Sequence, residues 1–465
     1  MITPQIFRAY DIRGIFEKDF DLEGAEKIGK GYGTYLIRTS EDIDAPLNVC
    51  VGRDGRIHGE EIQKAFVKGL LSTGIKITDI GLSFSPLVYF SICNGFFDGG
   101  VSITASHNPK EYNGFKLQRG DAHPICGEEI QEILKIIETE DFIESKETFE
   151  IEEKSFWEDY KKKIFDISHT PQKGKIVIDS GNGITGMFAP EIFRIFGYEV
   201  IELYCEVDGN FPNHDADPEN KENLEDLKDK VIKEQAQFGV AFDGDGDRVG
   251  IVDNEGRIYH ADELLIILIN DALKRNKNVS VVYTVTASGL IKEEIERLGG
   301  KAIESKVGHS FVEEKMREEN AIIGGESSGH FFFAENYYGY DDAILASIKI
   351  LEIVVSSGVS MKNHISNLPK IFTSPEIKVE VDDNKKFQLI EKIKKRFINK
   401  YPCNTLDGIK IDFGDKSWAV CRASNTSPKI SFRVEARDNK TVKELMVKIN
   451  QAIEEEKKNL PESIE

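Results

Sequence analysis

The sequence predicts an α/β protein built from several domains. Its 465 residues exceed what one hydrophobic core usually serves, so about two to four domains are expected. Over the first three-quarters of the chain, short apolar runs are followed by turns rich in Gly, Ser, Asp or Asn and then by segments of helical periodicity. This repetition predicts largely parallel sheets, whose ligands gather at the loops after the carboxyl ends of the strands.

Five apolar runs carry this pattern in chain order. Each is short and ends at a turn that contains Gly, Ser or Asp, as expected of a strand in a parallel sheet. The runs are 48–51, 100–103, 175–178, 238–242 and 281–285.

Beyond Pro369 the pattern changes. Two helical stretches and three strand-like stretches follow without regular alternation, which predicts a separate, smaller α+β domain. The strands are expected at 376–381, 418–421 and 429–434, and the helices at 385–399 and 442–460. Polar stretches at 138–153, 253–256 and 367–369 mark boundaries, so the predicted domains are 1–150, 151–255, 256–368 and 369–465.

Composition narrows the classes of function. The formal net charge of −21 disfavours nucleic acid or an anionic membrane as the main partner, and an anionic substrate would need a locally basic cleft. Six scattered cysteines without a C-x-x-C pair fit buried thiols better than disulfides or zinc. No apolar signal core begins the chain, and the run 264–269 is too short to span a bilayer. A cytoplasmic protein is expected.

Ser106 is the candidate nucleophile. It lies in Thr-Ala-Ser-His-Asn-Pro at 104–109, directly after an apolar strand, and Pro109 prevents the strand from continuing. Lys116, a few residues later, could neutralise a phosphate near the serine. A plain Ser or Asx turn is the alternative interpretation of this segment.

Asp243, Asp245 and Asp247 form a candidate metal site. The three carboxylates alternate with glycines, which allows a tight loop to turn them inward toward a Mg²⁺ ion. An EF-hand would require Gly and Glu where the chain has Arg248 and Asn254, so that interpretation fails. A purely structural acidic turn is disfavoured, because three like charges repel unless a cation joins them.

The segment 324–330 contains the sequence G-x-S-x-G, which is typical of serine hydrolases. An alternative interpretation is therefore a serine hydrolase with Ser327 as its nucleophile. That motif should lead into a helix, yet aromatic residues follow, and essentially only His364 could serve as the distal base. The favoured interpretation is a loop that offers Glu326, Ser328 and His330 to sugar hydroxyls.

Two further segments offer cationic and polar groups. Residues 422–428 follow a strand in the last domain and combine Arg422 with Ser424, Asn425 and Thr426, the components of a phosphate clamp, although such residues also make plain turns. Near the start, residues 7–14 bring Arg8, Arg13 and Tyr10 together.

In this order and spacing, these five segments resemble the α-D-phosphohexomutase superfamily, most closely its phosphomannomutase/phosphoglucomutase branch, over essentially the whole chain. The resemblance implies four domains around a central cleft, three with a similar α/β core and mixed, mainly parallel sheets. It also implies a phosphoserine at Ser106, with Ser106, Asp243, Asp245 and Asp247 around one Mg²⁺ ion. Glu326 and Ser328 would bind sugar hydroxyls, and residues 422–426 would hold the unreacting phosphate. The residues implied to line the cleft are Tyr10, Arg13, Lys116, Arg248, His309 and His330.

The implied activity is interconversion of hexose 1-phosphate and hexose 6-phosphate through a hexose 1,6-bisphosphate that turns over within the cleft. Ser327, where phosphoglucosamine mutases usually carry Gln, favours the hexose branch, and phosphoglucosamine mutase is the alternative activity. The segment 286–288 lacks the cation that the bifunctional branch often has, so the preference between glucose and mannose stays open. Small sugar phosphates are the expected partners, and a monomer or homodimer is expected.

Overall fold

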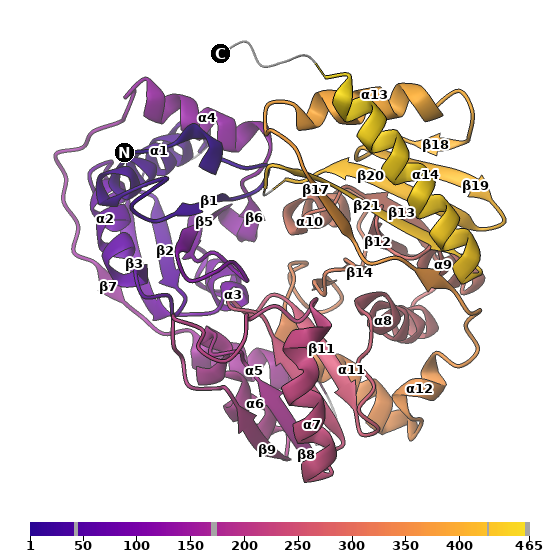
Figure 1. The fold of residues 1–465 in the computed structure, drawn as a ribbon. Helices are drawn as coiled ribbons and strands as arrows, with labels where there is room; N and C mark the ends of the chain where they lie inside the picture. Colours follow the sequence, from indigo (N-terminus) through magenta and orange to yellow (C-terminus); the bar gives the residue numbers. More distant parts are fainter. Residues whose placement is uncertain (41–44, 169–173, 426, 461–465) are drawn as a thin grey trace.

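The computed structural model describes residues 1–40, 45–168, 174–425 and 427–460. Four β-sheets succeed one another along the chain, and we call the regions that carry them domains I to IV. The domains surround a common centre, with domain I drawn from indigo to purple, domain II in magenta, domain III from rose to orange and domain IV from orange to yellow (Figure 1). The predicted fold class, three similar α/β domains and a different C-terminal domain, is confirmed.

Domain I contains a seven-stranded mixed sheet. Its strands β2, β3, β4 and β7 run parallel, whereas β1, β5 and β6 pair antiparallel. In sheet order the strands are β1 (Ile12–Ile15), β5 (Tyr112–Arg119), β4 (Gly99–Ile103), β2 (Asn48–Arg53), β3 (Lys76–Leu82) and β7 (Glu152–Glu153), with β6 (His123–Pro124) on β5. The helices are α1 (Leu22–Thr39), α2 (Gly59–Leu71), α3 (Ser85–Gly95) and α4 (Glu128–Glu138).

Domains II and III each have a four-stranded sheet with three parallel strands and one antiparallel edge strand. Domain II has strands β11 (Val249–Asp253), β10 (Phe238–Phe242), β8 (Gly174–Asp179) and β9 (Tyr198–Leu203), and helices α5 (Trp157–Ile167), α6 (Ala189–Ile195) and α7 (Glu225–Glu234). Domain III has strands β13 (Lys301–Ser305), β12 (Ser280–Thr284), β14 (Ile323–Gly325) and β15 (Phe331–Phe333), and helices α8 (Ala261–Arg275), α9 (Gly289–Arg297), α10 (His309–Glu318), α11 (Ala343–Ser357) and α12 (Met361–His364).

Domain IV is built on an antiparallel sheet covered by two helices. Its strands are β16 (Phe372–Thr373), β17 (Ile377–Glu380), β18 (Cys403–Asn404), β19 (Ile409–Gly414), β20 (Ser417–Ala423) and β21 (Lys429–Ala436), and its helices are α13 (Lys386–Phe397) and α14 (Asn439–Lys458). The Asp438 side chain caps α14 by accepting from the backbone N–H of Thr441. The apolar residues of α14 recur at helical spacing and pack into the core of this domain.

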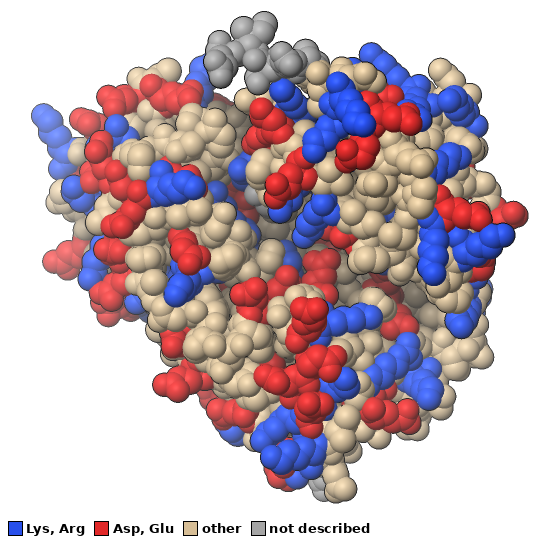
Figure 2. Space-filling model, in the orientation of Figure 1, with Lys and Arg blue, Asp and Glu red and all other residues tan. Residues whose placement is uncertain are grey.

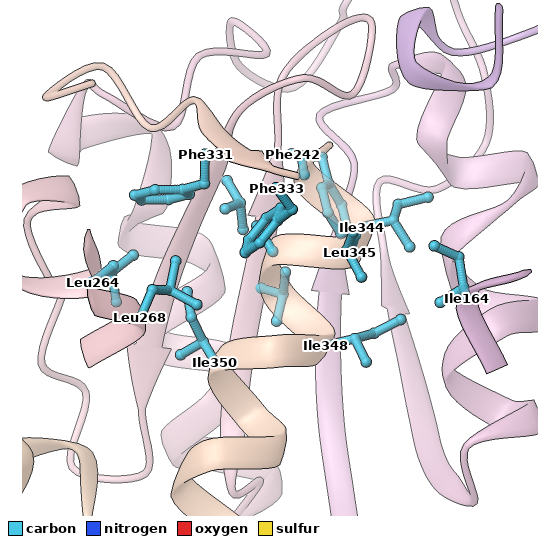
Figure 3. Packing of buried hydrophobic residues seen from close by; sticks show 14 of the residues in the cluster. Ile164, Phe242, Leu264, Leu268, Phe331, Phe333, Ile344, Leu345, Ile348 and Ile350 are labelled. Atoms are coloured by element: carbon cyan, nitrogen blue, oxygen red, sulfur yellow. The ribbon is translucent and has the colours of Figure 1, made fainter. Parts of the chain in front are cut away.

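One hydrophobic cluster joins domains II and III to helix α3 of domain I. Helix α11 lies in its centre, and its side chains Ile344, Leu345 and Ile348 point toward residues from other elements (Figure 3). Aromatic side chains of β10 and β15 belong to the same cluster. Continuous apolar packing of this kind holds the domain I, II and III loops at fixed positions relative to one another.

Candidate active site

Four loops meet at one cavity, and each is the connection of an antiparallel pair of strands. They join β4 to β5, β10 to β11, β14 to β15 and β20 to β21. Residues of all four domains line the cavity, whose volume is about 670 Å³, and the face in Figure 2 is hollowed where the domains meet. The expectation that helices follow the turns at 104–109 and 243–248 was wrong, because strands β5 and β11 follow them. Because an antiparallel strand follows each turn, residues on both sides of the turn lie at the site.

The first loop holds Ser106 in a constrained position. Its φ of 51° lies in the left-handed region, which is uncommon for a residue other than glycine. Its backbone N–H donates to the Thr104 hydroxyl at 2.9 Å, and that hydroxyl donates to Asp54 at 2.7 Å. The Ser106 hydroxyl lies in the cavity wall and is 2.9 Å from Asp243 in domain II.

Arg56, which sequence reasoning missed, fastens this loop. Its guanidinium donates to the backbone carbonyls of Ser106 and Asn108 at 2.7 Å, Pro109 at 2.9 Å and Tyr112 at 3.0 Å. Asp54 pairs with the same guanidinium at 3.2 Å. A planar fork with five donors suits this set of acceptors. The Arg-Asp-Gly-Arg turn after β2 was the only signal in the sequence, and it gave no indication of the loop that Arg56 contacts.

The second loop brings three fully buried carboxyl groups together. One oxygen from each of Asp243, Asp245 and Asp247 lies within 4.8 Å of the others. Asp243 also accepts from the backbone N–H groups of Gly246 and Asp247 at 3.0 Å and of Arg248 at 3.1 Å, which fixes the turn. The predicted glycine alternation therefore produces the inward arrangement expected of the three carboxylates.

Lys116 neutralises part of this negative charge. Its ammonium group donates to Asp245 at 2.6 Å and also to Asp247. Burial opposes the charge on Lys116, but the two carboxylates outweigh burial and hold its pKa well above the ordinary value. Burial and the neighbouring Asp247 and Asp245 raise the pKa of Asp243 well above the usual range. Because one lysine cannot compensate three carboxylates, a divalent cation is the expected partner.

The donor set fits a magnesium ion. The carboxyl oxygen Asp245 Oδ1 is buried and has no hydrogen-bond partner among the described residues, and the buried Asp247 Oδ1 lies 3.2 Å from His330 Nε2. Carboxylate and hydroxyl oxygens are the ligands that Mg²⁺ prefers, and the Ser106 hydroxyl lies beside them.

The third loop places Glu326, Ser328 and His330 in the cavity wall. Ser328 Oγ and His330 Nδ1 are 2.9 Å apart, and His330 Nε2 is 3.2 Å from Asp247. Glu326 accepts from the Gly308 N–H at 3.1 Å through one oxygen. Its other oxygen is buried 3.6 Å from His330 Nδ1 and accepts no hydrogen bond from the residues that the structure describes. An acceptor of this kind is available to a sugar hydroxyl.

The fourth loop contributes a cationic end to the cavity. Arg422 donates from Nε to Asp407 at 2.8 Å, and its buried Nη2 has no hydrogen-bond partner within the described part of the chain. The Asn425 amide donates to the Val307 carbonyl of domain III at 2.9 Å, and Ser424 also lines the cavity. Thr426, the fourth predicted member of the clamp, lies outside the described residues.

The remaining predicted cleft residues also line the cavity: Tyr10, Arg13, Lys116, Arg248 and His309. Arg13 donates to Asn108 of the serine loop at 2.7 Å. The Tyr10 ring meets the His309 ring edge to face, with centroids 5.1 Å apart, and burial raises the pKa of Tyr10 to about 12. Both rings therefore enter the site as neutral groups.

His107, to which sequence reasoning assigned no role, also lines the cavity. Its Nδ1 is 3.2 Å from the Ser106 hydroxyl. Burial and the charges of Arg248 and Arg13 hold its pKa well below the ordinary value, so its imidazole is neutral at neutral pH. A neutral imidazole at this distance can exchange a proton with the serine oxygen.

The geometry does not support the serine hydrolase. Ser327 Oγ lies 3.2 Å from Thr286 Oγ1, whereas the imidazole of His364 is paired with Ser357 at 3.0 Å. No hydrogen bond joins Ser327 to a histidine among the described residues.

Across the residues that the structure describes, no helix combines the length and apolar character needed to span a membrane.

Fold and site together define a multidomain phosphotransferase of the α/β class, with a serine, an acidic metal loop and two polar loops around one cavity. Four regions match the domains of one family, described as phosphoglucomutase/phosphomannomutase. Alpha/beta/alpha domains I, II and III match residues 4–144, 154–256 and 260–372, and the C-terminal domain matches residues 376–452. The chain belongs to the phosphoglucomutase/phosphomannomutase family, whose members are intramolecular phosphotransferases.

Individual relatives are similar to this protein over nearly the whole length of the chain. A phosphomannomutase/phosphoglucomutase of Pseudomonas putida is 38% identical over 94% of this chain and 92% of its own. A phosphoglucomutase of Neisseria gonorrhoeae is 37% identical over 97% of both chains. The crystal structure of a phosphoglucomutase/phosphomannomutase family protein from Burkholderia thailandensis is 32% identical, superposes with a TM-score of 0.89 and covers 98% of both chains.

Proposed function

We propose that this protein interconverts the 1-phosphates and 6-phosphates of glucose and mannose through a phosphoserine at Ser106. One observation carries the proposal: the Ser106 hydroxyl, the cationic Arg422 and the sugar loop at 326–330 line the same cavity. A substrate with a phosphate at one end and a hydroxyl at the other can then present either end to Ser106. The relatives named phosphomannomutase/phosphoglucomutase support the same activity.

In the first step, the bond between phosphorus and Ser106 Oγ breaks, and a bond forms to the free hydroxyl of the hexose phosphate. The hydroxyl proton passes to a basic side chain of the cavity, and Ser106 Oγ takes up a proton. His107 Nδ1, 3.2 Å from that oxygen, is the group we assign to the serine end. The bisphosphate then turns within the cavity, and the reverse step returns the other phosphate to Ser106.

Asp243, Asp245, Asp247 and Ser106 would hold the Mg²⁺ ion. When bound, the ion neutralises negative charge on the oxygens of the transferring phosphoryl group. Lys116 and Arg248 add positive charge at the same place, since both line the cavity within reach of the acidic loop. Most of the catalysis is therefore expected from fixed charge and from positioning.

The two polar loops would orient the substrate. Glu326 and Ser328 would form hydrogen bonds with ring hydroxyls. Arg422 Nη2, which has no hydrogen-bond partner among the described residues, would meet the phosphate that is not reacting. Recognition away from C2 would accept both glucose and mannose, which differ only there.

The six cysteines are free thiols, which supports a reducing, cytoplasmic location.

Transfer of radioactive phosphate tests the proposal. We expect the protein with Mg²⁺ and glucose 1,6-bisphosphate to convert glucose 1-phosphate and mannose 1-phosphate, and to carry label from the bisphosphate on Ser106. Ser106→Ala should lose both the label and turnover, whereas Ser327→Ala should keep the label. Turnover of glucosamine 1-phosphate alone would move the protein to the phosphoglucosamine branch. Normal turnover by Ser106→Ala would overturn the phosphoserine.

A further inference from the structure

Glu313 is a buried carboxyl group that the steps above do not use. It lies on α10, one helical turn after His309, and its relative exposure is 0%. Neither of its carboxyl oxygens has a hydrogen-bond partner among the described residues. Asp341, in the segment between β15 and α11, is equally buried, and both of its oxygens are unpartnered as well. Unpaired buried carboxylates are costly, so this pair requires a physical explanation.

The two carboxyl groups are too close for both to ionise at low cost. One oxygen of each lies within 4.8 Å of the other, and a ring nitrogen of His309 lies within the same distance of both. Two negative charges at that separation inside a protein repel strongly, so one group keeps its proton. Burial raises the pKa of Glu313 to about 8, and the cations of Arg317 and Lys116 oppose this rise only in part.

The charges that act on Glu313 come from both sides of the boundary between domains I and III. On α10 itself, His309 Nδ1 is 3.6 Å from the Glu313 carboxyl group. Arg317 follows one turn later and donates to the Asp121 backbone carbonyl of domain I at 2.9 Å. The charged or titratable groups from other elements are Lys116 of β5, Tyr89 and Cys93 of α3, Cys126 before α4, Asp247 of the β10–β11 loop, Glu326 of the β14–β15 loop, and Asp341.

His309 connects this buried group to the substrate cavity. It lines the cavity, and its Nε2 has no partner among the described residues. Burial, assisted by Lys116 and His330, holds the pKa of His309 well below its ordinary value, so the ring is neutral. A dianionic phosphate in the cavity therefore adds negative charge close to Glu313 with only a neutral ring between them. That charge favours the protonated form of Glu313.

We propose that Glu313 is a positioning residue that completes its protonation from solution when a hexose phosphate enters the cavity, so that substrate binding is linked to protonation behind His309. The proposal rests on the proposed function, because it takes a sugar phosphate as the ligand. The proton adds to a carboxylate oxygen of Glu313, and no bond of the sugar changes. Neutral Glu313 removes one repelling charge from that side of the cavity.

Calorimetry measures this uptake directly. The ligand is 1,5-anhydroglucitol 6-phosphate, which lacks the C1 hydroxyl that would accept a phosphoryl group, and it is titrated into the Mg²⁺-loaded protein. At pH 8 Glu313 is about half ionised, so its completed protonation takes up about half a proton for each ligand bound. The uptake is the slope of the observed binding enthalpy against the ionisation enthalpy of several buffers. The part of the uptake that Glu313→Gln removes should fall toward zero at pH 6, where Glu313 is already protonated. Subtracting the variant cancels the protons that the ligand's phosphate, whose second pKa is about 6, releases on binding.

Variants assign the proton to Glu313. Glu313→Gln should abolish the uptake at pH 8, whereas Glu314→Gln, at the exposed next position of α10, should retain it. An infrared difference spectrum of the unaltered protein provides a second measurement, because ligand binding at pH 8 should increase the absorption of protonated carboxyl groups.

Three results would overturn the proposal. Binding without proton uptake would reject it and leave the proposed function intact, whereas failure to bind any hexose phosphate would reject both. Two divalent cations per chain in the unaltered protein, and one in Glu313→Gln, would show that His309, Glu313 and Asp341 hold a metal instead.

Discussion

Gly244 belongs to the loop between β10 and β11 and touches the loop between β4 and β5, which carries Ser106. Replacing Gly244 with alanine tests how closely these two loops must approach. A Cβ atom at this position would lie 2.4 Å from the Ser106 carbonyl oxygen, whereas ordinary contact begins at about 3.4 Å. The loops would therefore have to separate by about 1 Å. Gly244 does not have a positive φ, so alanine meets no backbone penalty of that kind.

A displacement of about 1 Å between Ser106 and the carboxylates should lower kcat/KM about 100-fold, which corresponds to about 2.7 kcal/mol of transition-state stabilisation. The assay follows conversion of glucose 1-phosphate to glucose 6-phosphate with a coupled dehydrogenase. Overpacking should also cost about 1 to 3 kcal/mol of stability, so thermal unfolding must stay cooperative and above the assay temperature.

Gly59→Ala is the matched control for Gly244→Ala. It begins helix α2, its nearest neighbours would lie 3.6 Å from the new Cβ, and its φ is not positive. We expect kcat/KM to be unchanged in this variant. If Gly244→Ala retained kcat/KM within about threefold of the unaltered protein, the premise that loop separation sets the rate would be refuted.

Three further predictions concern buried charges. Arg56→Lys should lower kcat about 100-fold with little change in KM, because an ammonium group cannot reproduce the planar set of bonds to four carbonyls of the serine loop; unchanged steady-state kinetics would contradict this. Lys116→Met should cost about 3 to 5 kcal/mol in urea denaturation without Mg²⁺, because Asp245 and Asp247 lose their buried cation. Added Mg²⁺ should recover part of that loss, and an equal deficit with and without Mg²⁺ would argue against a shared role. Glu313→Gln should become more stable than the unaltered protein as pH rises. Folding raises the pKa of Glu313 from 4.5 to about 8. The free energy of unfolding of the unaltered protein therefore falls by up to about 5 kcal/mol as pH rises between these two values, whereas glutamine does not titrate and adds no such loss. Parallel stability curves from pH 5 to pH 8.5 would refute the prediction.

Residues whose chemistry is local in the chain could be predicted from the sequence. Ser106 and the three aspartates stand at the carboxyl ends of apolar strands, and glycine alternation makes the inward turn of the aspartates a property of six consecutive residues. The prediction of a helix after each turn failed for β4 and β10. A strand that precedes a helix and a strand that precedes an antiparallel neighbour begin with the same apolar run and turn, so the run does not distinguish them.

Residues that act across domains could not be predicted. Arg56 contacts a loop about fifty positions further along the chain, and only the pairing of β2 with β4 brings the two together. Glu313 stands in a run of charged residues on an amphipathic helix, a pattern typical of a solvent-exposed face. It is buried because α10 packs at the boundary with domain I.

The sequence by itself determined the chemical groups of this protein: a serine, a triad of carboxylates, the polar loop at 326–330, the loop that carries Arg422 and the strands that precede these loops. Only the tertiary structure decided which of their charges are compensated and which carboxyl group keeps a proton. Lys116 lies between Asp245 and Asp247, and Glu313 lies beside His309 with no hydrogen bond to its carboxyl group from any described residue. Coulomb and desolvation energies depend on distance and burial in space, and the order of residues along the chain does not contain either quantity.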